Sequence, residues 1–232
     1  MEPTGTASLP TWTSVLVVVA HPDDESFGLG AVISRFVGAG AAVSVLCLTR
    51  GEASTLHGVD GDLATIREAE LTAAADALGV STVRLLDYPD GGLGDVDLDE
   101  LADLVREMSG EVAAEGLLAF DSTGVTGHPD HVRATAAAVA AAQARGVGVL
   151  GWTLPESVAH ALRAEFGLDF RGRQADEIDL VVPVDRGRQR RAVGCHPSQA
   201  VPGSALWRRL ELEGDVEHLR WLQQTASDSA AD

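Results

Sequence analysis

The sequence predicts a single-domain α/β protein with a doubly wound, mostly parallel sheet that carries helices on both faces. Short apolar runs rich in β-branched residues alternate with segments of helical periodicity, and the links between them are short. This alternation is typical of parallel strands joined by right-handed crossovers. The apolar run at 15–20 also leads directly into charged residues, as strands of open parallel sheets do beside a site. We therefore expect a Rossmann-like sheet.

The first half of the chain contains three predicted strands and two predicted helices. Apolar, mostly β-branched runs predict the strands, apolar residues at helical spacing predict the helices, and glycines mark the helix ends. In chain order these are a strand over 15–20, a helix over 29–37, a strand over 42–49, a helix over 64–78 and a strand over 83–86.

The second half continues the alternation and then becomes less regular after Pro155. Its predicted elements are a helix over 97–114, a strand over 117–120, an alanine-rich helix ending at Arg145, a strand over 147–152, a short helix over 156–165, an edge strand over 177–184, a helix over 186–193 and a last helix over 204–223.

Length and charge limit the organisation and the partners. A chain of 232 residues suffices for one core and is short for two. We expect a disordered leader over 1–13, one domain over 14–224 and a flexible tail over 225–232. The formal net charge of -18 argues against nucleic acid and anionic membranes as partners, because phosphate-rich surfaces are bound by clustered cations.

The two cysteines and the apolar runs bear on localisation. Cys47 and Cys195 form neither a CxxC metal motif nor a disulfide framework. The N-terminus lacks a basic region followed by an apolar stretch, and no apolar run approaches the length of a membrane span. We therefore expect a cytoplasmic protein.

Two His-Pro-Asp clusters follow predicted strands about a hundred residues apart, HPDDE at 21–25 and GHPDH at 127–131. Taken singly, acids after a strand can cap a helix, and a lone histidine can be a satisfied polar residue. Together the clusters supply imidazoles and carboxylates, the ligands that zinc prefers. Two histidines and one carboxylate would leave a coordination position open for water, as catalytic sites do.

These clusters resemble the signatures of the LmbE-like, or PIG-L, family of metal-dependent de-N-acetylases. Weaker motifs agree, and the resemblance covers most of the chain. They are TRGE at 49–52, Arg67 with Glu70, YPDG at 88–91 and HPSQ at 196–199.

The resemblance implies a role for each matched residue. The residues that hold Zn²⁺, or another divalent metal such as Fe²⁺, would be His21, Asp24 and His131. Asp23 would be the base that deprotonates the nucleophilic water. His128, protonated and oriented by Asp130, would stabilise the oxyanion. The residues that contact the substrate would be Arg67 and Asp90, with His196 at the rim of the site.

One residue departs from the family pattern. Some members carry a tyrosine two residues before the histidine that matches His128, and this chain has Thr126 there. Oxyanion stabilisation would then depend more on the metal and on His128.

The implied function is a zinc-dependent hydrolase that removes an N-acetyl group from an amino sugar, such as an N-acetylglucosaminyl-type glycoside, or from a related small N-acyl conjugate. The alternatives are an amidase of thiol S-conjugates, a hydrolase of phosphate esters with two metal ions, and a non-catalytic sugar-binding relative. A homo-oligomer is compatible with the resemblance, because the family's members vary. The loops at 50–63, 88–96 and 167–177 are the candidates to border the substrate. Trp152, Trp207 and Trp221 are expected in the core or at an interface.

Overall fold

The computed structural model describes residues 8–55 and 61–225. Within them the sheet follows the strand order β3-β2-β1-β4-β5-β8-β7, with the short β6 paired to β5. The strands are β1 (Ser14–Val19), β2 (Ala42–Thr49), β3 (Thr82–Tyr88), β4 (Gly116–Phe120), β5 (Gly148–Pro155), β6 (Gly172–Arg173), β7 (Leu180–Pro183) and β8 (Val216–Gln223).

The five adjacent strands β3, β2, β1, β4 and β5 are parallel to one another, and β8 runs antiparallel to both β5 and β7. The predicted mostly parallel sheet is therefore confirmed. Because β2 and β4 flank β1 on opposite sides, the strand order reverses at β1. Ligand sites of open α/β sheets lie at such a point, outside the carboxyl ends of the strands.

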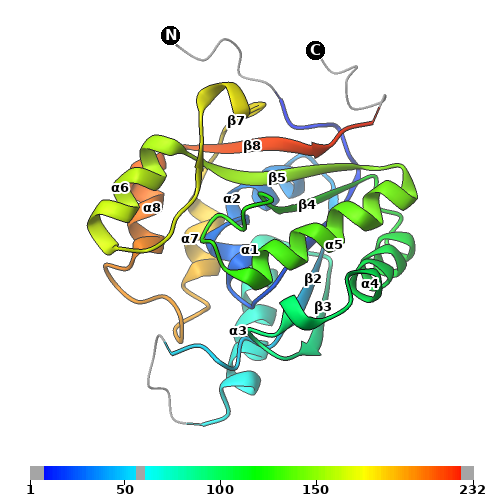
Figure 1. The fold of residues 1–232 in the computed structure, drawn as a ribbon, viewed down its shortest axis with the longest axis horizontal. Helices are drawn as coiled ribbons and strands as arrows, with labels where there is room; N and C mark the ends of the chain where they lie inside the picture. The colour runs from blue at the N-terminus through cyan, green and yellow to red at the C-terminus, as the bar shows by residue number, and fades with distance from the viewer. Residues whose placement is uncertain (1–7, 56–60, 226–232) are drawn as a thin grey trace.

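Helices cover both faces of the sheet (Figure 1). They are α1 (Asp24–Phe27), α2 (Gly30–Gly38), α3 (Leu63–Leu78), α4 (Leu98–Glu111), α5 (Pro129–Arg145), α6 (Glu156–Phe166), α7 (Gly187–Val193) and α8 (Ala205–Glu213), with short 3-10 turns at Leu93–Asp95 and Ala175–Glu177.

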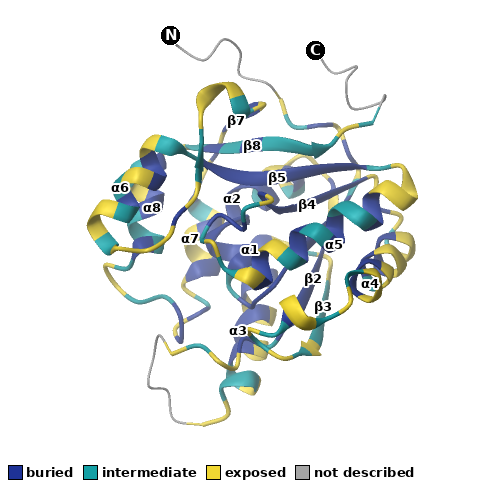
Figure 2. Cartoon of the chain, viewed as in Figure 1, coloured by how far each residue is buried: buried dark blue, intermediate teal, exposed yellow. Residues whose placement is uncertain are grey.

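Alternate residues of β1 face two separate apolar clusters. Val15 and Val17 pack with residues of α2 and α3, while Leu16 and Val18 pack with residues of α4 and α5. All four are buried, and Figure 2 shows that β4, which pairs with β1, and β5 beyond it are buried along most of their length. A strand that is apolar on both faces is the signature of a sheet covered on both sides.

The predicted last helix over 204–223 is wrong in its second half. Helix α8 ends at Glu213, Gly214 adopts a positive φ of 59°, and the chain then returns as β8 between β5 and β7. The strand was hard to recognise because its inward face includes Glu217, which is fully buried. Glu217 accepts hydrogen bonds from Trp152 Nε1 at 2.7 Å and from Arg209 Nη1 at 3.0 Å.

The expected leader is packed against the domain in its described part. Trp12 is buried, and its ring lies 5.9 Å from that of Phe36 and 5.8 Å from that of Trp221. Residues 1–7 of the leader and 226–232 of the expected tail lie outside the described residues. Among the residues described, no helix combines the length and apolar character that crossing a membrane requires.

Candidate active site

The two His-Pro-Asp clusters meet at the carboxyl ends of β1 and β4, which are paired neighbours. His21 follows β1, whereas His128 and His131 lie at the start of α5, which follows β4. The ring of His21 lies 4.9 Å from that of His128 and 5.1 Å from that of His131, centre to centre. The parallel pairing of two strands thus brings together residues about a hundred positions apart.

His21, Asp24 and His131 direct ligand atoms at one point. His21 Nδ1 lies 3.2 Å from His131 Nε2, and Asp24 Oδ1 lies 3.2 Å from the same nitrogen. These three residues offer ligand atoms that all lie within 4.8 Å of one another. Their donor set of two imidazoles and one carboxylate suits a divalent transition metal such as zinc.

The second nitrogen of the His131 ring has protein partners. Nδ1 lies 3.1 Å from the carbonyl oxygen of Gly124 and 3.0 Å from Thr126 Oγ1. A carbonyl only accepts, so Nδ1 carries the proton and Nε2 presents a lone pair. Partners of this kind fix the tautomer and orientation of metal-binding histidines.

His21 has carboxylates on its other nitrogen. Its Nε2 lies 2.9 Å from Asp90 Oδ1 and 3.3 Å from Asp130 Oδ2. Burial alone would lower the pKa of His21, but hydrogen bonds to Asp130 and Asp90 and the charge of Asp24 raise it to about 10. The surroundings of His21 are therefore strongly negative, and a divalent cation fits them.

A second trio, His21, His128 and Asp130, also has ligand atoms within 4.8 Å of one another. Both oxygens of Asp130 already accept backbone hydrogen bonds, from Gly91 at 2.8 Å and from Leu93 at 3.1 Å. Asp24 Oδ1 has no backbone donor of this kind in the described part of the chain. The first trio is therefore the better match to a metal.

Asp23 lies beside the trio in a strained backbone conformation. It precedes α1 with φ 128° and ψ −26°, and its side chain makes no capping hydrogen bond. Positive φ is uncommon outside glycine, and such strain gathers at functional sites. Burial raises the pKa of Asp23 to about 6, against the lowering effect of the Arg67 charge. The Asp23 side chain therefore does not cap α1, and its carboxylate, with a pKa of about 6, can act as a base near neutral pH.

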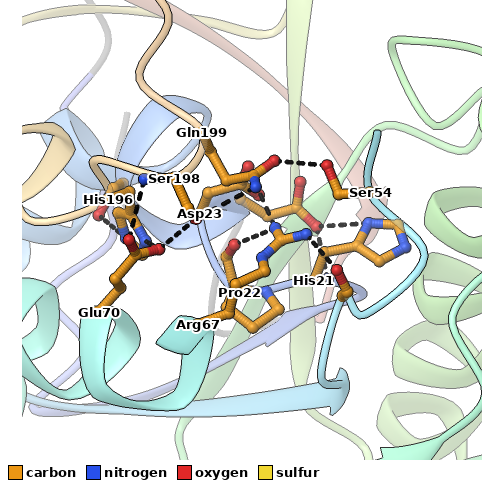
Figure 3. A network of polar contacts seen from close by, with 12 residues as sticks. His21, Pro22, Asp23, Ser54, Arg67, Glu70, His196, Ser198 and Gln199 are labelled. Atoms are coloured by element: carbon orange, nitrogen blue, oxygen red, sulfur yellow. Dashed lines mark hydrogen bonds and ion pairs between the residues drawn. The ribbon is translucent and has the colours of Figure 1, made fainter. Parts of the chain in front are cut away.

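Arg67 is buried and joins α3 to the loop after β1 (Figure 3). Its Nη2 lies 3.3 Å from Asp23 Oδ2 and also donates to the carbonyl oxygen of Pro22. Its Nη1 donates to the carbonyl oxygen of Gly51 at 2.7 Å. A Cβ at Gly51 would lie 2.3 Å from Nη1, so a glycine is needed where the guanidinium meets the chain.

The expectation that His196 lies at the rim of the site is wrong. His196 is fully buried behind Asp23, and its Nε2 lies 2.8 Å from Glu25 Oε1. The other oxygen of Glu25 accepts the backbone N–H of Asp23 at 2.9 Å. A buried carboxylate needs partners, and His196 is one of them, together with the Ser26 hydroxyl, which donates to Glu25 Oε1 at 2.5 Å. Burial would lower the pKa of His196, but the charge and hydrogen bond of Glu25 raise it.

The loop that carries His196 reaches the site through later residues. Ser198 donates to Glu70 of α3 from its backbone at 2.9 Å and from its hydroxyl at 2.6 Å. Gln199 Oε1 accepts a hydrogen bond from Ser54 Oγ at 2.8 Å. The loop that carries His196 therefore meets the loop after β2 above Arg67, as Figure 3 shows.

His128 is half-buried, and its orientation comes from the backbone of Asp130. The N–H of Asp130 donates to His128 Nδ1 at 3.2 Å, whereas the Asp130 carboxylate faces His21 and the loop at 91–93. Burial, together with the electrostatic effect of the neighbouring His21 and His131, lowers the pKa of His128. A neutral ring with Nδ1 as acceptor keeps its proton on Nε2. We expected a protonated His128, and the geometry supports a neutral donor instead.

The site opens into a cavity of about 440 Å³. Its polar end includes Arg67, Asp90, Ser54 and Gln199, and all three candidate loops contribute to the cavity. The lining residues are His21, Asp23, Asp24, Phe27, Gly28, Ala53, Ser54, Thr55, Arg67, Asp90, Gly91, Phe120, Thr126, His128, His131, Trp152, Phe170, Gln199, Leu206 and Arg209.

Sequence reasoning missed two parts of the site. Glu25 was visible as the last residue of HPDDE, but its contact with His196 spans 171 positions. The apolar wall of Phe27, Phe120 and Phe170 carried no motif at all. Trp152 is in the core as expected, and it also lines the cavity.

Comparisons with known proteins place these residues in a family. Residues 16–142 match the family model described as PIG-L, GlcNAc-PI de-N-acetylase. This segment contains every residue of the two clusters. The chain belongs to the PIG-L family.

Two bacterial relatives are named as deacetylases. The 1D-myo-inositol 2-acetamido-2-deoxy-α-D-glucopyranoside deacetylase of Kineococcus radiotolerans is 36% identical over 179 residues, which are 62% of this chain and 50% of that protein. The Salinispora arenicola protein of the same name is 32% identical over 209 residues, 74% of this chain and 68% of that protein. The chain thus spans about half the length of the first relative and about two thirds of the second.

Solved structures share the fold at low identity. The zinc-inhibited form of teicoplanin deacetylase Orf2 has a TM-score of 0.66 at 22% identity, covering 90% of this chain and 97% of that one. The N,N'-diacetylchitobiose deacetylase of Pyrococcus horikoshii has a TM-score of 0.64 at 23% identity, with coverages of 93% and 87%. The hydratase GalB of Pseudomonas putida reaches 0.67 at 22%, with coverages of 92% and 98%. Since a hydratase shares this fold, the fold alone does not determine the reaction, which depends on the residues of the site.

Proposed function

We propose that this protein is a zinc-dependent hydrolase that removes an N-acetyl group from an amino sugar, in an N-acetylglucosaminyl-type glycoside, or from a related small N-acyl conjugate. The observation that carries the proposal is the convergence of His21, Asp24 and His131 on one point. The carboxylate of Asp23 lies beside these three residues and is not one of the proposed ligands. Amide hydrolysis needs a nucleophile, a way to hold negative charge on oxygen, and a proton for the amine. Each need has a residue here.

His21, Asp24 and His131 would hold the metal. When bound, zinc polarises a carbonyl and lowers the pKa of water to about 7. Asp90 and Asp130 orient His21 through its Nε2, and Gly124 orients His131 through its Nδ1.

Asp23 is the general base. Its pKa of about 6 leaves the carboxylate ionised at neutral pH yet basic enough to take a proton from the attacking water. Arg67 and Glu25 hold it in place, one through the side chain and the other through the backbone N–H. Once protonated, Asp23 can return the proton to the departing amine.

His128 is the oxyanion donor. Its Nδ1 accepts the N–H of Asp130, so the Nε2–H is available for the oxygen of the tetrahedral intermediate. Preorganised donors of this kind typically contribute about 10²–10³-fold in kcat. Thr126, which stands where some family members carry a tyrosine, has its hydroxyl 3.0 Å from His131 Nδ1.

The polar end of the cavity suits a sugar. We propose that Arg67 and Asp90, which border it, contact sugar hydroxyls in addition to holding Asp23 and His21. The names of the relatives support a substrate in which an acylated amino sugar is joined to an inositol.

The substrate is proposed to be a small molecule, with neither nucleic acid nor membrane as a partner. A cytoplasmic location is supported by the two cysteines, both of which are free.

The test joins metal analysis to an assay of amine release over N-acetylated glycosides, with an S-conjugated amide in the panel. We expect one zinc per chain and release of amine from glycosides. Asp23→Ala should keep the metal and lose nearly all turnover, whereas His131→Ala should lose the metal. Zinc-loaded protein that releases amine from none of these compounds would contradict the proposal.

A further inference from the structure

Residues from three of the sequence motifs have no direct part in the proposed chemistry, and the structure brings them together behind Asp23. They are Glu25 at the end of HPDDE, Glu70 of α3, and His196 with Ser198 in the loop after α7. Figure 3 shows His196, Ser198 and Glu70 on one side of Asp23. All four residues are buried, and none of them lines the cavity. Any part that they play in the reaction must be exerted through a residue that does line it.

The backbone of Asp23 is held by one of these residues. Asp23 has a φ of 128°, and a strained conformation of this kind persists only where the surroundings enforce it. The N–H of Asp23 donates to Glu25 Oε2 at 2.9 Å. Because hydrogen bonds to an ionised acceptor are strong, Glu25 opposes a return of this backbone to a relaxed conformation. The direction of the Asp23 carboxylate depends on the same backbone angles.

Glu25 is in turn fixed through its other oxygen. Oε1 lies 2.8 Å from His196 Nε2 and accepts from the Ser26 hydroxyl at 2.5 Å. Ser26 follows Glu25 directly, so His196 is the partner that comes from a distant part of the chain. With two donors on Oε1, the side chain keeps Oε2 directed at the N–H of Asp23.

Helix α3 holds the loop that carries His196. The backbone and hydroxyl of Ser198 both donate to Glu70, whereas His196 Nδ1 has no hydrogen-bond partner in the described part of the chain and lies 4.0 Å from Glu70 Oε2. Glu70 and Arg67 are three residues apart on α3 and therefore on one face of it. The same helix thus contacts the carboxylate of Asp23 through Arg67 and supports its backbone through the His196 loop.

We infer that His196 is a positioning residue, which holds the backbone N–H of Asp23 through Glu25 and so keeps the Asp23 carboxylate directed at the three proposed metal ligands. The inference rests on the proposed hydrolase function, in which Asp23 is the base. It adds a residue that lies outside the segment matched to the family model, 16–142. A misplacement of about 1 Å in a reacting group can cost about 10²-fold in rate.

Three variants of His196 give the kinetic test, in zinc-loaded enzyme with an N-acetylglucosaminyl glycoside. His196→Leu should lower kcat by about tenfold to a hundredfold, while KM and zinc content stay near wild type, because His196 contacts neither the cavity nor a proposed ligand. His196→Gln places an N–H near the position of Nε2 and should recover most of the activity. His196→Asn places its N–H near the position of Nδ1, which faces no acceptor within hydrogen-bond distance, and should resemble His196→Leu.

Thermal melts check that each variant folds. If His196→Leu does not fold, the comparison of His196→Gln with His196→Asn still decides the question. Equal kcat in these two variants, or a rise in KM with kcat unchanged in any of the three, overturns the inference.

His218→Leu is the matched control, since it makes the same change at a second histidine–glutamate pair. His218 Nδ1 lies 3.2 Å from Glu213 Oε1, and neither residue contacts Asp23. This variant should melt at a lower temperature than wild type and keep its kcat. A fall in kcat as large as that of His196→Leu would mean that general loosening of the fold lowers activity, which overturns the inference.

Hydrogen exchange tests the hold on Asp23 without any turnover. In protein labelled with ¹⁵N-aspartate, the Asp23 amide is the signal that Asp23→Asn removes. It should exchange about tenfold or more faster in His196→Leu and His196→Asn than in wild type and His196→Gln, as expected when a hydrogen bond to a charged group is weakened. The amide of Asp121, which donates to the carbonyl oxygen of Trp152 at 2.7 Å, should be unchanged.

The two measurements separate the inference from the proposed function. An Asp23 amide that exchanges at the same rate in all of these proteins overturns the inference and leaves the hydrolase proposal standing. Faster exchange in His196→Leu, in a zinc-loaded protein that hydrolyses none of the compounds, supports the hold of His196 on Asp23 and contradicts the hydrolase.

Discussion

Arg67 Nη2 lies 3.3 Å from Asp23 Oδ2. This ion pair joins helix α3 to the residue proposed as the base. The guanidinium is buried, so its charge is poorly screened by solvent. Burial and the neighbouring Asp24 raise the pKa of Asp23, and Arg67 opposes both. The working range of the base therefore depends on its burial and on an arginine from another helix that opposes the effect of burial.

Replacing Arg67 by Met should move the acid limb of the kcat/KM profile to higher pH. Without the positive charge the pKa of Asp23 rises, and the base is deprotonated only at higher pH. The expected shift is about one pH unit or more, typical of an opposite charge at this separation. Arg67→Lys keeps the charge and should lie closer to wild type. A lowered plateau with an unmoved limb would show that Arg67 acts only on structure or substrate.

Asp23→Gly should be more stable than Asp23→Ala. Both remove the carboxylate, so they differ chiefly in tolerance of the backbone at φ 128°. Strain of this kind costs about 1–3 kcal/mol, and the greater freedom of unfolded glycine offsets about 0.4–1 kcal/mol. We expect a net advantage of about 1 kcal/mol, or roughly 2–4 °C in Tm, in metal-free protein. Equal melting temperatures would mean that the loop relaxes without cost.

Asp90→Asn should weaken zinc binding. Asp90 faces His21 Nε2 at 2.9 Å and also accepts the N–H of Ala53 at 2.9 Å. Loss of such a partner of a metal-binding histidine typically costs about 10–100-fold in affinity, and Asp130 should limit the loss to the lower part of that range. Competition with a zinc chelator measures it. If Asp90 serves the sugar alone, KM will rise and the zinc affinity will stay unchanged.

The order of the elements and the meeting of the two clusters were predictable from the sequence. Both depend on local signals, since the β-branched run at 15–20 and the helical spacing around it need no knowledge of distant contacts. Once β1 and β4 are neighbours, His21 and His131 must meet, because parallel strands end at one edge of the sheet.

The errors arose where one residue depends on a partner far along the chain. Strand β8 was not predicted because the sequence pattern treats Glu217 as a solvent-facing residue. Only the structure shows that Glu217 is buried and paired with Arg209 and Trp152. His196 was assigned to the rim for a similar reason, since its pairing with Glu25 cannot be read from spacing. Contacts between residues so far apart in the chain depend on how the whole core packs, and a local sequence pattern does not predict them.

Asp121→Asn should destabilise the protein in a pH-dependent way. Asp121 is fully buried directly after β4 and accepts from Arg173 Nη2 at 2.7 Å, which ties the end of β4 to β6. Burial would raise the pKa of Asp121, but the hydrogen bonds of Arg173 and Thr123 hold it below its usual range. A folded pKa below the unfolded value of about 3.9 means that ionised Asp121 stabilises the fold above about pH 4. This contribution is lost as the pH falls through the folded pKa.

We therefore expect Asp121→Asn to lose roughly 3–5 kcal/mol at pH 7, the cost typical of breaking a buried ion pair. The difference from wild type should shrink below about pH 4, and urea denaturation at several pH values measures it. Asp169→Asn is the control, because Asp169 and Arg171 form a pair 2.6 Å apart with side chains 61% and 56% exposed. Exposed pairs contribute about 0–1 kcal/mol, so this variant should stay near wild type throughout. A difference for Asp121→Asn that is equally large at pH 7 and pH 3 would mean that packing at this site, and not the charge of Asp121, carries the stability.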